Sequence, residues 1–213
     1  MTEEEERAIA LEAETLRFYT DHGDLFSNEE FSHHPNFLTD LLYLASLLEP
    51  DPILLDVGCG SGRCYSDMRE FGRYIGFDPS SKAIEQAREK YPDGDFRVGN
   101  MHAIKECVTE VCDLFISQTS LMHIPPARMP SALQNIRSVM RTGGFGNILL
   151  PIGDSEVVST HESISEMPPG YSVYSKSWTL EELASYLTEA RFEIIRPTDN
   201  TFFSGLTVSV RAI

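Results

Sequence analysis

The chain has 213 residues, and 41% of them are hydrophobic, which is the size and composition of one α/β domain with a sizeable core. Its 33 acidic side chains outnumber the 17 basic ones and give a formal net charge of −16. A field of this sign repels phosphate backbones and anionic membrane surfaces, so neither nucleic acid nor a membrane is expected as a partner. We therefore expect residues 1–213 to form a single domain.

The start of the chain and its cysteines indicate the cytoplasm. The first residues read Met-Thr-Glu-Glu-Glu-Glu-Arg, the opposite of a basic signal peptide, and no apolar run is long enough to span a membrane. The cysteines show no C-x-x-C pairing, and we expect all of them to be reduced. The expected location is cytoplasmic.

Two helices are predicted before the first strand. Residues 3–19 place apolar side chains at helical spacing opposite a glutamate-rich face, which is typical of a surface helix. Residues 35–48 are apolar on one broad face, and Pro35 suits the first turn of a core helix. We therefore expect a helical cap over residues 1–35 and a core over residues 36–150.

A strand followed by glycines is the most informative stretch. Residues 53–57 form a short apolar run of the kind found in a buried parallel strand. Gly58, Gly60 and Gly62 follow, and without Cβ atoms they let a ligand approach the backbone amides where a helix begins. Asp56 near the end of the strand is costly to bury unless a cationic ligand group or the loop amides bind to it.

The spacing of these glycines argues against a dinucleotide site. In the pattern G-x-G-x-x-G the third glycine lets helix and strand pack closely. Counted from Gly58 and Gly60, that place is taken by Arg63, which is too bulky. The sequence therefore does not match the fingerprint for NAD.

Strands and helices then alternate. We predict strands over residues 74–78, 96–98, 112–117 and 146–150, a helix to about Glu70, and helices over 81–91 and 126–141, the last closed by Gly143 and Gly144. Such alternation implies a parallel sheet covered on both faces. Asp78 ends the second strand and either binds ribose hydroxyls or caps the next helix.

The regular pattern stops over residues 151–178, where proline, glycine, serine and tyrosine are frequent, and we expect a long substrate loop. Thr179 and Glu182 then form a capping box that opens a helix. Residues 191–196 and 206–211 alternate as a terminal hairpin, so 179–213 is a helix plus hairpin.

The predicted fold class is α/β. It is a doubly wound, seven-stranded, mostly parallel Rossmann-like sheet whose last strand is antiparallel, with an N-terminal helical cap.

The motif D-V-G-C-G-S-G at residues 56–62, with an acid at the end of the second strand, resembles the first motif of class I S-adenosylmethionine-dependent methyltransferases. The resemblance extends over about residues 36–213 and favours the small-molecule branch of that family. It implies that S-adenosylmethionine is the cofactor and that a small molecule is the methyl acceptor. The cofactor-binding candidates are Asp56, Gly58, Cys59, Gly60, Arg63, Asp78, Pro79, Asn100, Met101, Ser117 and Gln118. Asn100 departs from the family pattern, in which an aspartate is common.

Methyl transfer from a sulfonium is an in-line displacement that depends mainly on positioning, but an oxygen or nitrogen acceptor still has to lose a proton. His123, in the polar turn after the fourth strand, is the candidate catalytic base; the alternative is that it only caps or packs under the next helix. The candidate substrate residues are Tyr19, His123, Tyr171, Tyr174 and Trp178, for which ordinary packing is the alternative. No acid lies between Ser117 and Asp154, so we expect no metal.

Two other functions remain open at this point. A non-catalytic S-adenosylmethionine-binding protein would keep the glycine loop and lose the acceptor site, against which the polar turn at 118–123 argues. A NAD-dependent oxidoreductase would share the first strands, but Arg63 and the terminal hairpin argue against it.

Overall fold

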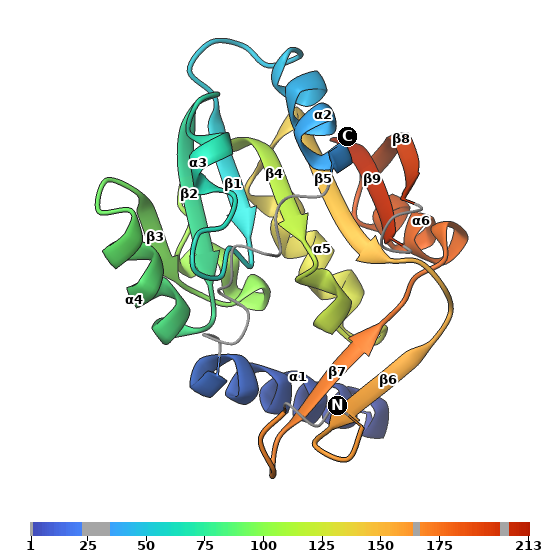
Figure 1. The fold of residues 1–213 in the computed structure, drawn as a ribbon. Coiled ribbons are helices and arrows are strands. Elements are labelled where there is room, and N and C mark those ends of the chain that lie inside the picture. The colour runs from blue at the N-terminus through green and yellow to red at the C-terminus, as the bar shows by residue number, and fades with distance from the viewer. Residues whose placement is uncertain (1, 23–34, 164–166, 201–204) are drawn as a thin grey trace.

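The computed structural model describes residues 2–22, 35–163, 167–200 and 205–213 (Figure 1). Residues 23–34, which belong to the predicted helical cap, lie outside the described residues. None of the helices in the described ranges combines the length and hydropathy that a membrane span requires.

A seven-stranded sheet with the order β3-β2-β1-β4-β5-β9-β8 forms the centre of the molecule. β9 pairs antiparallel with β5 and β8, while β1 to β5 pair in parallel, so the predicted fold class is confirmed. The strands are β1 (Ile53–Val57), β2 (Arg73–Asp78), β3 (Asp95–Val98), β4 (Cys112–Gln118), β5 (Met140–Pro151), β8 (Phe192–Asn200) and β9 (Gly205–Ala212).

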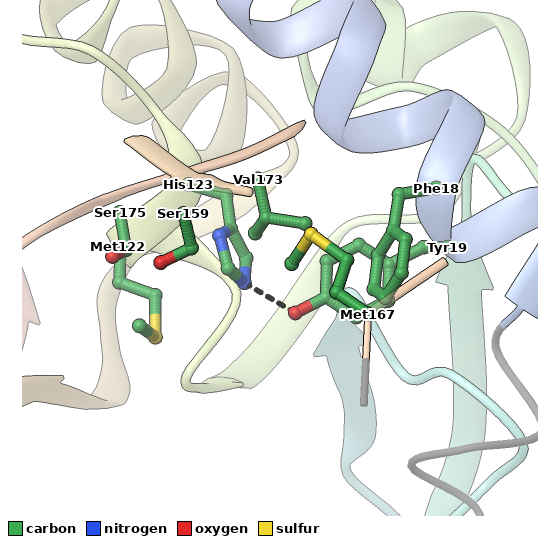
Figure 2. A pocket seen from close by; sticks show the side chains of 8 residues that line it. All are labelled: Phe18, Tyr19, Met122, His123, Ser159, Met167, Val173 and Ser175. Atoms are coloured by element: carbon green, nitrogen blue, oxygen red, sulfur yellow. Dashed lines mark hydrogen bonds between the residues drawn. The ribbon is translucent and has the colours of Figure 1, made fainter. Parts of the chain in front are cut away.

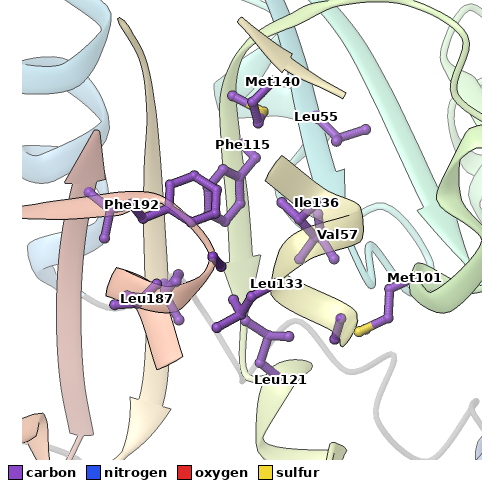
Figure 3. Close-up of a cluster of buried hydrophobic side chains, with 14 of the residues drawn as sticks. Leu55, Val57, Met101, Phe115, Leu121, Leu133, Ile136, Met140, Leu187 and Phe192 are labelled. Atoms are coloured by element: carbon purple, nitrogen blue, oxygen red, sulfur yellow. The ribbon is translucent and has the colours of Figure 1, made fainter. Parts of the chain in front are cut away.

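Helices cover both faces of this sheet (Figure 1). Alternate strand residues point to opposite faces, so Leu55 and Phe115 pack with α5 and α6 in one cluster, which Figure 3 shows. Leu54 and Leu114 pack with α2 and α4 in a second cluster. The helices are α2 (Pro35–Ala45), α3 (Tyr65–Met68), α4 (Ser81–Lys90), α5 (Met129–Ser138) and α6 (Leu180–Glu189), with short 3-10 turns η2 (Met101–Glu106) and η3 (Leu121–His123).

The boundary between α5 and β5 differs from the prediction. The helix ends at Ser138, and both Gly143 and Gly144 lie inside the strand. The register with β4 shifts there, and a Cβ atom on Gly144 would lie 2.8 Å from the Asp113 carbonyl oxygen. The prediction that these glycines close the helix was wrong, because they instead allow two strands to approach closely. The helix after the glycine loop is also shorter than predicted, at Tyr65–Met68.

The segment 151–178 is more regular than expected. β6 (Glu156–Thr160) and β7 (Ser172–Lys176) pair antiparallel as a separate two-stranded sheet, so the expectation of an irregular loop is corrected for these residues. Their β-branched and aromatic side chains, such as Val157, Val158 and Val173, favour extended structure.

α1 (Glu3–His22) lies beside β7, below the main sheet in Figure 1. Glu12 accepts hydrogen bonds from Arg128 Nε and from the imidazole of His102, each at 3.0 Å. Thr15 Oγ1 accepts the backbone N–H of Tyr174 at 2.9 Å. The N-terminal helix is therefore fixed to η2, to the start of α5 and to β7.

The contact between Gly146 and Phe115 offers a test of the packing between β4 and β5. An added Cβ atom at Gly146 would lie 2.0 Å from a ring carbon of Phe115, so Gly146→Ala is expected to lower the free energy of unfolding by about 1–3 kcal/mol. Urea unfolding measures this change. In a Phe115→Leu background the same substitution should cost clearly less, and an equal cost in both backgrounds would contradict the packing argument.

Candidate active site

The glycine loop between β1 and α3 is bound to the end of β2. The N–H groups of Gly58 and Cys59 both donate to the Phe77 carbonyl, at 2.9 and 3.1 Å. Gly58 has a positive φ of 75°, and a Cβ atom there would lie 2.4 Å from Ser120. Gly60 has a φ of 53°, and a Cβ atom there would meet nothing within 4 Å. The first glycine therefore serves packing, whereas the second faces open space.

Asp78 connects the end of β2 to this loop. Its Oδ2 accepts the N–H of Gly60 at 3.0 Å, and its Oδ1 accepts the N–H of Ser80 at 2.8 Å. Ser80, and not Asp78, is the N-cap of α4, because its hydroxyl accepts the Ala83 N–H. Burial raises the pKa of Asp78, while the two amides act in the opposite direction. A carboxylate has about four lone-pair sites, so two of them remain for a ligand.

Asp56 is almost fully buried, and the group that hydrogen-bonds to its carboxylate is not one of those predicted. The Tyr74 hydroxyl donates to Asp56 Oδ2 at 2.9 Å, where a cationic ligand group or a loop amide had been predicted. Burial raises the pKa of Asp56 to about 7, although Tyr74 and the positive charge of Arg63 favour ionisation. A cation placed beside Asp56 would stabilise its ionised form further.

The other cofactor-binding candidates lie around the same strand ends. Arg63 is exposed, and its guanidinium lies 3.5 Å from the Gln118 carbonyl oxygen. Pro79 is partly exposed directly after Asp78. Cys59 is buried under the loop, where burial raises the pKa of its thiol well above the usual value. These residues therefore lie together along the carboxyl ends of β1, β2 and β4.

Asn100 and Met101 follow β3. Asn100 is exposed, and its Oδ1 caps η2 by accepting the N–H of His102 at 2.9 Å. Met101 is 7% exposed and packs into the larger core cluster. The side-chain oxygen of Asn100 is therefore used for this cap. Its side-chain nitrogen makes no hydrogen bond with any of the described residues.

The polar turn after β4 is explained by internal hydrogen bonds. Ser120 Oγ donates to the Val57 carbonyl at 2.7 Å and lies 2.7 Å from Ser117 Oγ, which ties β4 to β1. Gln118 donates to Asn147 Oδ1 at 3.0 Å inside the sheet. Ser117 and Gln118 thus use their side chains for the scaffold, and they can offer mainly backbone groups to a ligand.

Thr119 marks this turn as strained. It has a φ of 63°, in the left-handed region that β-branched residues rarely adopt. Its N–H donates to the Leu149 carbonyl at 3.0 Å, which helps to hold the backbone in place. Strain of this kind concentrates at functional sites.

His123, in η3, is held by hydrogen bonds at both ring nitrogens. Its Nδ1 lies 2.7 Å from the Tyr174 carbonyl, which can only accept, so Nδ1 carries the proton. Its Nε2 lies 3.0 Å from the Tyr19 hydroxyl, which therefore donates to it. Burial lowers the pKa of His123, although the bond to Tyr174 opposes this. The imidazole is thus neutral, with a basic nitrogen directed at Tyr19.

A pocket of about 180 Å³ opens beside this pair (Figure 2). Tyr19 and Phe18 reach it from α1, His123 from η3, and the hairpin of β6 and β7 closes another side. Its lining residues are Phe18, Tyr19, Met122, His123, Ser159, Met167, Val173 and Ser175. The structure therefore brings together two of the predicted substrate residues, Tyr19 and His123.

The other three aromatic candidates lie elsewhere. Trp178 is fully buried in the larger core cluster and packs edge-on against Tyr186. The ring of Tyr174 is also buried, and only its backbone carbonyl reaches His123. Tyr171 packs on α1, and its hydroxyl donates to Asp21 at 2.9 Å. These three side chains therefore do not line the pocket beside His123.

Sequence reasoning missed most of the pocket lining. Ser159, Val173 and Ser175 belong to the unpredicted hairpin, and Met122 and Met167 belong to turns. The β-branched runs at 157–158 and 173 were the available signal for the hairpin. Within the described ranges, no group of three or more His, Cys, Asp or Glu side chains is arranged to hold a metal ion.

The bond between Tyr74 and Asp56 yields a pH prediction. A raised carboxyl pKa means that the folded state binds more protons than the unfolded state between about pH 4 and 7, so the contribution of Asp56 to stability falls as pH rises through this window. Tyr74→Phe should extend the decline to higher pH and cost about 1–3 kcal/mol near pH 7. Urea unfolding from pH 5 to 9 measures both effects.

The matched control is Tyr43→Phe, because Tyr43 is 42% exposed on α2. Asp56→Asn should remove the decline that Asp56 causes. Equal pH profiles for the parent protein and Asp56→Asn would contradict the assignment.

Comparison with known proteins finds methyltransferases both among sequence relatives and among solved structures. Residues 54–144 match a family model described as a methyltransferase domain. The protein named "Putative methyltransferase 235L" of Invertebrate iridescent virus 6 is 29% identical over 136 residues, which cover 62% of this chain. The match spans 48% of that relative, about half its length.

Two solved structures resemble nearly the whole chain. The 1,6-didemethyltoxoflavin-N1-methyltransferase of Burkholderia thailandensis, with bound 1,6-didemethyltoxoflavin and S-adenosylhomocysteine, matches with a TM-score of 0.70 and 18% identity over 100% of this chain and 91% of that one. The magnesium protoporphyrin IX methyltransferase of Synechocystis, with bound S-adenosylmethionine, matches with a TM-score of 0.70 and 14% identity over 95% of this chain and 97% of that one. Residues 54–144 therefore resemble a methyltransferase domain, and nearly the whole chain has the Rossmann-like fold of these two solved structures.

Proposed function

We propose that this protein is an S-adenosylmethionine-dependent methyltransferase that transfers a methyl group by in-line displacement to an oxygen or nitrogen atom of a small molecule. The observation that carries the proposal is the cradle at Gly60. The backbone of Gly60 is in the left-handed region, and a Cβ atom there would meet nothing within 4 Å. Its N–H group is held in place by the hydrogen bond to Asp78. The methyltransferase domain match supports the same activity.

The residues around the cradle fit the parts of this cofactor. Asp78 retains lone pairs for ribose hydroxyls, and Asp56 lies where it can stabilise a cationic amino group through Tyr74 and the loop. Asn100 and Met101 would flank the base, with the amide of Asn100 exposed. When bound, the cofactor supplies a methyl group that is already activated as part of a sulfonium.

His123 is the proposed catalytic base. The Tyr174 carbonyl fixes its tautomer with the basic nitrogen, Nε2, on the side of Tyr19 and the pocket, and burial keeps the imidazole neutral. A neutral imidazole can accept the proton that the acceptor loses during transfer. We infer transfer without a metal, because the polar side chains near the strand ends are already engaged with one another and include no carboxylate cluster among the described residues.

The expected partner is a small molecule, in keeping with the substrates that the two solved neighbours are named for. Nucleic acid is not expected, because the net charge of −16 opposes a phosphate backbone. A cytoplasmic location is inferred from the cysteines, all of which are free: Cys59, Cys64, Cys107 and Cys112.

Thermal melts with S-adenosylmethionine, S-adenosylhomocysteine and NAD at equal concentrations test the cofactor. A ligand that binds only the folded state at 100 times its dissociation constant adds about 2.7 kcal/mol, which corresponds to a rise in Tm of about 5–10 °C for this chain length. We expect this rise with the two adenosyl ligands and none with NAD. Asp78→Ala should abolish it.

Two further variants separate binding from folding. Gly60→Ala adds a methyl group that meets no protein atom, so it should block the ligand-induced rise while costing only about 1 kcal/mol of stability through its backbone. Asp154→Ala, at an exposed acid outside the site, should keep the full rise. A rise with NAD alone would overturn the methyltransferase proposal in favour of an oxidoreductase.

A further inference from the structure

We propose that Thr15 is a positioning residue that fixes the proton of His123 on Nδ1 and so leaves Nε2 as the basic nitrogen. This inference rests on the proposed function, in which His123 is the base, and adds to it a residue of α1 that acts on the base from a distance. It is carried by two hydrogen bonds that meet at one residue of β7. The N–H of Tyr174 donates to Thr15 Oγ1 at 2.9 Å, and the carbonyl of Tyr174 lies 2.7 Å from His123 Nδ1.

The hydroxyl of Thr15 is held in one orientation. Thr15 is buried in α1, and its Oγ1 donates to the Leu11 carbonyl one turn earlier at 2.9 Å. A hydroxyl has a single proton, so this bond leaves only the lone pairs of Oγ1 for β7, and the Tyr174 N–H uses one of them. The branched side chain of a threonine also has few rotamers in a helix. Thr15 therefore presents a fixed acceptor to the edge of β7.

The backbone of Tyr174 connects this acceptor to His123. In a β-strand, the N–H and the carbonyl of one residue point to the same side. Tyr174 lies opposite Val158 in the hairpin of β6 and β7. Its N–H bonds to α1 and its carbonyl bonds to η3, so both groups are used on the side of β7 away from β6. Because Thr15 holds the nitrogen of Tyr174, it also determines where the neighbouring carbonyl points.

The Tyr174 carbonyl selects the tautomer of His123. A carbonyl oxygen can only accept, so it binds the imidazole only when Nδ1 is protonated. The Tyr19 hydroxyl, 3.0 Å from Nε2, can donate or accept and is therefore compatible with either tautomer (Figure 2). A weaker bond to the carbonyl would let the proton shift to Nε2. The nitrogen on the side of Tyr19 could then no longer accept a proton from the methyl acceptor.

The helix α1 reaches both ring nitrogens of His123. Thr15 and Tyr19 are four residues apart, so they lie on the same face of the helix. Tyr19 contacts Nε2 directly, whereas Thr15 acts on Nδ1 through Tyr174. Burial lowers the pKa of His123 and favours the neutral imidazole, which has one proton for two nitrogens. The N-terminal helix therefore helps to determine which nitrogen is basic.

The test locates the proton of His123 by two-bond nitrogen–proton correlation spectra of protein with isotope-labelled histidine at pH 8, with and without S-adenosylhomocysteine. The signals of His123 are assigned by their loss in His123→Gln. In the parent protein we expect the proton on Nδ1. Thr15→Val keeps the shape of the side chain and removes the hydroxyl, so the ratio of the Nδ1–H to the Nε2–H form should fall by about threefold or more, the usual effect of losing one hydrogen bond. Thr15→Ala should show the same fall, and Thr15→Ser, which keeps a hydroxyl, should retain the parent spectrum.

Two control variants separate this effect from a general change in the packing of helices. Thr188→Val removes an equivalent hydroxyl on α6, which donates to the carbonyl four residues earlier at 2.8 Å, and it should leave the His123 signals unchanged. Glu12→Gln weakens the ion pair that joins α1 to Arg128. It should lower the Tm without moving the proton of His123.

Other outcomes overturn the inference. A proton on Nε2 in the parent protein would refute it even if a variant at Thr15 failed to fold. An unchanged ratio in Thr15→Val, or an equal change in Glu12→Gln, would make Thr15 a residue that only joins α1 to β7.

These spectra need no methyl acceptor, so they are independent of the test of the cofactor. The rise in Tm with S-adenosylhomocysteine should be as large in Thr15→Val as in the parent protein, and its loss in this variant alone would overturn the inference by assigning Thr15 to the cofactor site. Absence of the rise in the parent protein is the separate result that refutes the proposed function itself.

Discussion

The hydrogen bond between the Gly60 amide and the Asp78 carboxylate is the contact on which the site depends. It joins the loop after β1 to the end of β2, and it aligns a ligand-facing backbone with an acid that retains free lone pairs. From Asp78 a second bond leads to Ser80, and from Ser80 a third leads to the backbone of Tyr19. The glycine loop and the pocket beside His123 are therefore parts of one hydrogen-bonded unit.

Much of the fold and the cradle could be predicted from the sequence because their signals are local. A buried apolar run, three glycines and an acid-ended strand fix their own structure within about 25 residues of chain, and Asp56, Gly60 and Asp78 do lie together. The parallel pairing of β1 to β5 also follows from the alternation of strands and helices. The ends of helices and strands were less predictable. Gly143 and Gly144 are typical of a helix end in the sequence, but in the structure they lie in a strand that packs closely against its neighbour.

The pocket beside His123 could not be predicted because segments far apart in the sequence form it. Tyr174 reads locally as an aromatic candidate, yet its backbone carbonyl, and not its ring, meets His123. Trp178 reads the same way and lies in the core. Tertiary packing decides which face of β7 meets α1, and the periodicity of the sequence does not predict this packing. His123 and Tyr19 were identified singly, but their pairing across 104 positions appears only in three dimensions.

The contact between α1 and β7 affects the order in which parts of the protein can fold. Thr15 and Tyr174, which join α1 to β7, are 159 positions apart. During synthesis α1 therefore meets its partner only after β7 has been made, whereas the glycine loop and β2 come from neighbouring segments. Contacts of such long range form late in folding. The contact between Tyr19 and His123, which depends on the docking of α1, should therefore form after the glycine loop has met β2.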